Sequence, residues 1–218
     1  MKHFLILCIC LMTSLFGFSQ EQRDSMANNY VSEHVKFMGI AMEGPLEEFK
    51  DKLIAKGLKF YMVNEKNVTI LTGLFAGHQA FIILQPNRNN EIFRVQVIFA
   101  DGKNCFTSWK ELSNLYYDLK KLLISKYGQP KECTEKFIGK KPTNDRDRIL
   151  AVAQEKCDYN CYFSLQGEST YEGGSVIISI DEFPIGSISL KIAEQVIRLT
   201  YIDLQQEIKQ DHQNIDDI

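Results

Sequence analysis

Residues 108–128 carry the most regular pattern in the sequence, and it limits the possible folds most strongly. The segment opens with Ser-Trp-Lys-Glu, which has the S-x-x-E form of a helix capping box. Gly128 and Pro130 end it. Between them, large apolar residues recur at helical spacing: Leu112, Leu115, Tyr116, Leu119, Leu122 and Leu123. The predicted helix is amphipathic, and its apolar stripe must be covered by another layer of structure.

The segments before this helix have the composition and period of β-strands. In residues 91–99, apolar Phe93, Val95 and Val97 alternate with polar residues, which predicts a strand with one face in water. We expect this apolar face to pack against helix 108–128. Further segments rich in β-branched and aromatic residues are separated by short turns and predict an antiparallel meander: 59–63, 68–75 and 78–85.

A shorter helix and a second set of strands complete the predicted order. Residues 45–56 have apolar side chains on one helical face between Gly44-Pro45 and Gly57. Residues 130–149 are polar and contain two prolines, so we predict a loop there. The last predicted strands are 161–166, 175–180 and 196–203.

This order predicts an α+β fold with antiparallel sheet, in which one amphipathic helix per αβββ unit packs on one face and two units follow in tandem. The predicted divisions are a signal peptide at 1–19, a flexible N-terminal segment at 20–36, a first unit at 37–104, a second unit at 105–204 with an insertion near 130–156, and a polar tail at 205–218.

The N-terminus predicts export from the cytoplasm. Residues 4–16 form an uncharged apolar run behind Lys2, too short to span a bilayer, and small residues Gly17 and Ser19 precede the expected cut before Gln20. An uncleaved N-terminal anchor is the alternative. A lipidated cysteine is disfavoured because bulky residues flank Cys8 and Cys10. The mature protein is therefore expected to be periplasmic or secreted, without a membrane span once the leader is removed.

Four cysteines follow the predicted leader: Cys105, Cys133, Cys157 and Cys161. In an oxidising compartment they are candidates for structural disulfides, and three pairings are possible. If Cys157 and Cys161 lie in one extended strand, they are about 13 Å apart and cannot bond to each other. A single C-x-x-x-C without a nearby histidine does not fit a zinc site, so no metal is expected.

The sequence contains no recognisable catalytic or cofactor-binding constellation. The formal net charge of −3 disfavours nucleic acid as a partner. The histidines after the leader, His34, His78 and His212, have no partner at triad or ligand spacing. Nucleotide-binding and nucleophile-elbow motifs are absent. Adjacent carboxylates at 47–48, 181–182 and 216–217 point in different directions and do not make acid–base pairs.

Two groups of residues have both a structural and a functional interpretation. One is a basic segment, which either faces solvent or contacts an anionic glycan or lipid: Lys136, Lys140, Lys141, Arg146 and Arg148. The other is aromatic, and its spacing favours core positions over a contact surface: Trp109, Tyr116, Tyr127 and Tyr201.

Several phrases resemble a group of secreted Bacteroidota proteins without an established activity, over about residues 34–204. They are TGLFAG, KYGQP, KECTEKF, EKCDY, GGSVIISI and VIRLTYID, together with the segment around the first helix. The repeated αβββ order is also similar to the architecture of the β-lactamase inhibitor protein and of small outer-membrane assembly lipoproteins, a likeness that concerns the fold alone. The resemblance implies a Cys133–Cys157 disulfide and leaves Cys105 to pair with Cys161.

These features favour a non-enzymatic binding or interaction protein whose partner is an unknown protein or envelope component, contacted through the sheet face. An apolar patch on the exposed sheet would support this hypothesis. The alternative is a small-ligand-binding protein, or an unrecognised hydrolase, with a pocket between helix 108–128 and the sheet. A fully packed helix–sheet interface would exclude the alternative.

Overall fold

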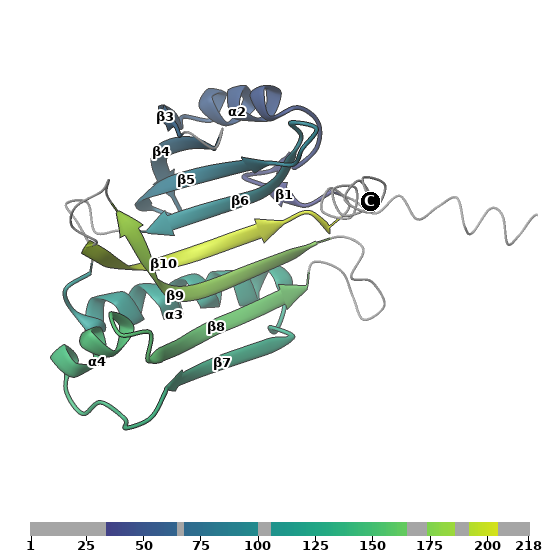
Figure 1. Cartoon of the computed structure of the whole chain (residues 1–218). Coiled ribbons are helices and arrows are strands. Elements are labelled where there is room, and N and C mark those ends of the chain that lie inside the picture. Colours follow the sequence, from purple (N-terminus) through teal and green to yellow (C-terminus); the bar gives the residue numbers. More distant parts are fainter. Residues whose placement is uncertain (1–33, 65–67, 100–105, 165–173, 186–191, 205–218) are drawn as a thin grey trace, which may run out of the picture. The chain divides into compact units, whose positions relative to one another are not determined.

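A computed structural model describes residues 34–64, 68–99, 106–164, 174–185 and 192–204 (Figure 1). The predicted signal peptide, Cys105, His212 and the polar tail lie outside these residues. The described elements, in chain order, are β1 (Lys36–Phe37), β2 (Ile40–Ala41), α2 (Leu46–Ala55), β3 (Lys59–Val63), β4 (Thr69–Phe75), β5 (His78–Pro86), β6 (Ile92–Phe99), α3 (Trp109–Tyr127), β7 (Glu132–Phe137), α4 (Asp145–Val152), β8 (Cys157–Ser164), β9 (Ser175–Ile185) and β10 (Ile192–Ile202).

Eight of these strands form one antiparallel sheet in the order β3-β4-β5-β6-β10-β9-β8-β7. β1 and β2 form a separate two-stranded hairpin. This strand order divides the sheet into two units, and each unit is a helix followed by four antiparallel strands in sequence. The two units join where β6 pairs with β10, with Val97 opposite Leu199. The predicted α+β fold with antiparallel sheet is therefore confirmed, although each unit has four strands instead of the three of the predicted αβββ order.

The elements predicted from strong local patterns lie close to their predicted bounds. Helix 108–128 is α3, and the Ser108 side chain accepts a hydrogen bond from the Glu111 backbone N–H at 3.4 Å, as a capping box requires. Gly128 ends the helix with φ 82°, a conformation that favours glycine. The helix predicted at 45–56 is α2, and the meander before α3 comprises β3 to β6.

The predicted loop at 130–149 is wrong, because this region contains β7 and the start of α4. β7 is an edge strand, and charged residues separate its few apolar ones, so its period is weak. α4 has only eight residues and no clear apolar face, although the Asn144 side chain caps it by accepting from the Asp147 N–H at 2.8 Å.

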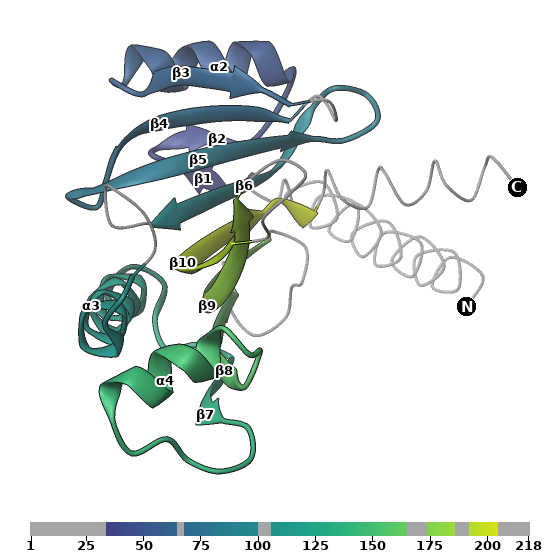
Figure 2. The ribbon, with the colours of Figure 1, turned by 60° about the vertical axis from the view of Figure 1, so that its left-hand side comes forward.

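Both long helices cover the same side of the sheet and share one core with it (Figures 1 and 2). Val95 and Val97 of β6 belong to this core. However, α3 packs mainly on β8, β9 and β10, whereas α2 packs on β5. The expected pairing of helix 108–128 with the strand at 91–99 is corrected accordingly: the tandem units place each helix over strands of its own unit.

The described residues include His34 and Val35, which fall within the segment 20–36 that the sequence predicts to be flexible. Val35 is buried, and its backbone N–H donates to the Asp203 carboxylate at 2.9 Å. His34 Nδ1 lies 3.0 Å from the same carboxylate oxygen. These contacts join the first described residues to the end of β10, although 169 residues separate His34 from Asp203.

Candidate functional site

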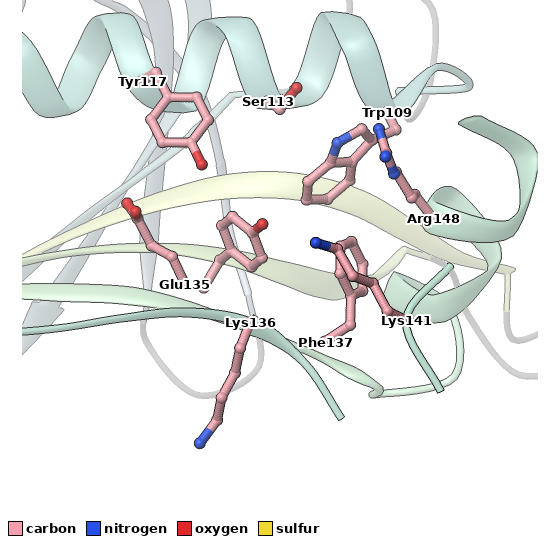
Figure 3. Close-up of a pocket in the computed structure, with 9 residues that line it drawn as sticks. Trp109, Ser113, Tyr117, Glu135, Lys136, Phe137, Lys141 and Arg148 are labelled. Atoms are coloured by element: carbon pink, nitrogen blue, oxygen red, sulfur yellow. The ribbon is translucent and has the colours of Figure 1, made fainter. Parts of the chain in front are cut away.

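A pocket of about 390 Å³ lies beside α3, between its first turns, β7 and the region of α4 (Figure 3). Its volume is in the lower part of the range for small-molecule sites. The pocket occupies the position that the alternative hypothesis gives for a ligand site, between helix 108–128 and the sheet. Nine residues line it: Trp109, Ser113, Tyr117, Glu135, Lys136, Phe137, Lys141, Arg148 and Tyr159.

Three aromatic rings from three different elements form one wall of the pocket. The ring centroid of Trp109 lies 5.0 Å from that of Phe137 and 5.2 Å from that of Tyr159, and Phe137 and Tyr159 are 5.7 Å apart. Trp109 is only 6% exposed. The prediction that Trp109 is a core residue is therefore correct, yet its ring also reaches the pocket. Mutual packing holds the wall in place before any ligand binds.

A carboxylate fixes α4 against the start of α3. Asp145 accepts hydrogen bonds from the backbone N–H groups of Trp109, at 3.2 Å, and Lys110, at 2.9 Å. These N–H groups have no partner within their own helix, and a negative charge at this helix end is favourable. Because Asp145 is the first residue of α4, the bond also places Arg148, about one turn later, beside the pocket.

Charges are distributed unevenly around the pocket. Glu135 lies on the Tyr117 side, where Lys120 binds it at 2.6 Å (Figure 3). Lys141 and Arg148 lie on the Trp109 side, and neither forms a salt bridge with any residue that the structure describes. The Lys136 side chain extends away from the other lining residues, and its ammonium lies 4.0 Å from Asp158.

Tyrosine hydroxyls near the pocket remain protonated at neutral pH. Burial, followed by the neighbouring Tyr117, raises the pKa of Tyr159 to about 12. Burial, followed by Glu135, raises the pKa of Tyr116 well above its usual range. Both groups can donate hydrogen bonds, and neither is a phenolate base under ordinary conditions.

The structure pairs Cys133 with Cys161 in a disulfide. The Cys133–Cys157 pairing implied by the resemblance is therefore wrong. Cys133 lies directly opposite Cys161 in the β7–β8 ladder, whereas Cys157 lies opposite Phe137. Glu135 also lies near the two sulfurs, but sulfurs joined in a disulfide are not thiolate ligands, so we assign no metal to this group.

The remaining sequence candidates do not meet at this site. His34 has two carboxylates nearby, Asp203 at 3.0 Å and Glu43 at 3.7 Å. It does not line the pocket, and its contact with Asp203 joins it to the end of β10. Local sequence spacing could not reveal the His34–Asp203 contact. His78 is exposed at the start of β5. The adjacent Glu47 and Glu48 lie in the first turn of α2, where the helix dipole favours them.

A second feature lies at the opposite edge of the sheet. All five residues of β3 are exposed, and four of them in succession are apolar: Phe60 (53%), Tyr61 (57%), Met62 (42%) and Val63 (46%). β3 pairs with β4 on one side and is the end strand of the described sheet, next to α2 in Figure 2. An apolar edge strand exposed in this way is unusual unless it has a binding role.

Comparison with protein-family models, with curated proteins and with solved structures finds no match. Among the described residues, every helix is too short or too polar to cross a membrane.

Proposed function

We propose that this chain is a non-enzymatic binding protein that holds a small molecule in the pocket beside α3. The observation that carries the proposal is an open pocket with a preassembled aromatic wall, formed by Trp109, Phe137 and Tyr159, at the predicted helix–sheet position. Ligand sites commonly combine such apolar walls with a few polar groups.

The lining residues favour binding over catalysis. Ser113 is the only serine among the lining residues. Its hydroxyl donates a hydrogen bond to the Lys110 carbonyl, and no lining residue beside it can act as a base. Glu135 is bound by Lys120, and the pKa of Tyr159 is raised to about 12. An activated nucleophile needs an adjacent base, which this set of side chains does not supply.

The sole tryptophan of the chain reports directly on this pocket. We expect an anilinonaphthalene probe to quench Trp109 fluorescence saturably and with a single-site isotherm. Ser113→Phe should weaken binding at least tenfold, because the new ring fills the pocket. Ser125→Phe, the same substitution at an exposed position of α3 outside the lining, should leave binding unchanged. Equal binding by the two variants, with both folded by circular dichroism, would contradict the proposal.

The exposed β3 supports a second function, closer to the interaction protein that the sequence favours. In this second function, the partner is an extended protein segment with alternating apolar side chains. The segment would pair with β3 as an additional strand at the edge of the sheet. The backbone of β3 would supply affinity, while Phe60 and Met62 would contact alternate side chains of the segment.

Photocrosslinking in the native envelope tests this second function. With p-benzoylphenylalanine in place of Val63, we expect one discrete product whose linked peptide is extended and apolar. The same substitution at Leu122, an exposed apolar residue on α3, should not give that product. If both positions give the same products or none, β3 is not the binding edge.

A further inference from the structure

We propose that the ligand of the pocket beside α3 is an anion with an aromatic body, its carboxylate, phosphate or sulfonate group bound by Lys141 and Arg148. This inference rests on the proposed function, because it names the ligand class of the same pocket.

Three carboxylates that lie on α4 beside Arg148 in the sequence or in the pocket lining already have hydrogen-bond or salt-bridge partners. Asp145 accepts from two backbone N–H groups at the start of α3. Asp147 accepts from the Asn144 side chain at 2.8 Å, within the first turn of α4. Glu135 is held by Lys120 on the other side of the pocket. None of these carboxylates forms a salt bridge with Lys141 or Arg148.

Lys141 and Arg148 therefore line one side of the pocket without a salt bridge to any described residue. Arg148 is half-buried, so its guanidinium is partly removed from water. A partly desolvated cation is stabilised by an anion at hydrogen-bond distance, and a guanidinium binds planar or tetrahedral oxyanions through two parallel hydrogen bonds. Lys141 adds a second positive charge on the same side (Figure 3).

The aromatic wall determines the other half of the ligand. Trp109 lines the same pocket as both cations, and its ring packs on Phe137 and Tyr159. A flat ring attached to the anionic group could stack on this wall while the oxyanion contacts the cations. An inorganic anion would contact Lys141 and Arg148 but not the aromatic wall, so we expect it to bind more weakly than an aromatic anion.

Two probes with the same ring system separate these contributions. 1-Anilinonaphthalene-8-sulfonate is anionic, and N-phenyl-1-naphthylamine is its neutral counterpart. We expect the anionic probe to quench Trp109 with an affinity at least tenfold higher than the neutral one at low salt. The preference should shrink as salt is added, because salt screens partly exposed charges. Competition by 1-naphthoate and by 1-naphthyl phosphate then compares carboxylate with phosphate.

Charge variants localise the effect. Lys141→Gln together with Arg148→Gln should abolish the preference for the anionic probe and leave the neutral probe bound as before. The matched control, Lys140→Gln with Arg146→Gln, removes two exposed cations of the same segment that do not line the pocket, and it should keep the preference.

The outcomes distinguish this inference from the proposed function. Equal affinities for the two probes in the native protein, or a preference that survives in the Lys141/Arg148 variant, would overturn the anionic ligand class while the pocket remains a binding site. If neither probe quenches Trp109 in the folded protein, the proposed function itself fails.

Discussion

Asp203→Ala is expected to lower the free energy of unfolding by about 3 kcal/mol. The Asp203 side chain is fully buried and accepts hydrogen bonds from the Val35 N–H and from His34. Alanine would leave the buried Val35 N–H without an acceptor and would detach the N-terminal residues from the end of β10. Urea unfolding followed by circular dichroism should show a lower midpoint at an unchanged slope.

Two further variants make this experiment specific. Asp203→Asn keeps one oxygen acceptor and should recover part of the loss. Asp51→Ala removes an exposed carboxylate from α2 and should change stability by less than about 0.5 kcal/mol. A midpoint for Asp203→Ala equal to that of Asp51→Ala would show that the carboxylate does not anchor the N-terminus.

The parts of the fold that the sequence predicted well are those determined by local patterns. The capping box at Ser108 and the apolar stripe through Tyr116 specify α3 within the helix itself, so no knowledge of its neighbours was needed. The alternation in β6 is equally local, because successive side chains of a strand face opposite sides. The fold class followed from the order of these elements.

The missed features depend on residues far apart in sequence. β7 is recognisable only once it lies beside β8, since its own alternation is weak. The disulfide pairing could not be derived without β7, because it is the register of β7 against β8 that brings Cys133 opposite Cys161. The bond from Asp145 to the first turn of α3 spans 36 residues and has no local signal.

A ligand site between helix 108–128 and the sheet remains a prediction, and the sequence did not indicate which residues line the pocket found there. The sequence identified helix 108–128 as one side of a possible pocket and marked Lys141 and Arg148 as part of a basic segment. It favoured a solvent-exposed loop for that segment, because charged runs usually face water. Folding of 130–149 into β7 and α4 instead brings Lys141 and Arg148 into the same pocket lining as Trp109, whereas the Lys136 side chain is turned away.

Removal of both Cys133 and Cys161 by alanine substitution should lower the free energy of unfolding by about 3.5 kcal/mol in the absence of reductant. The bridge spans 28 residues, which include the loop after β7 and all of α4. Without it, the unfolded chain gains conformational freedom, and edge strand β7 is held by its ladder with β8 and by side-chain contacts alone. Because Phe137 and Glu135 lie on β7, binding of the naphthalene probes should weaken as well.

Reduced native protein provides an independent check, since reductant should lower the stability of the native sequence towards that of the double variant and leave the variant unchanged. Cys157→Ala is the matched control: it should cost less than about 1.5 kcal/mol and keep its sensitivity to reductant. Non-reducing peptide mapping should recover Cys133 linked to Cys161. Recovery of Cys133 linked to Cys157 or Cys105, with Cys157→Ala as destabilising as the double variant, would mean that the β7–β8 register does not determine the pairing.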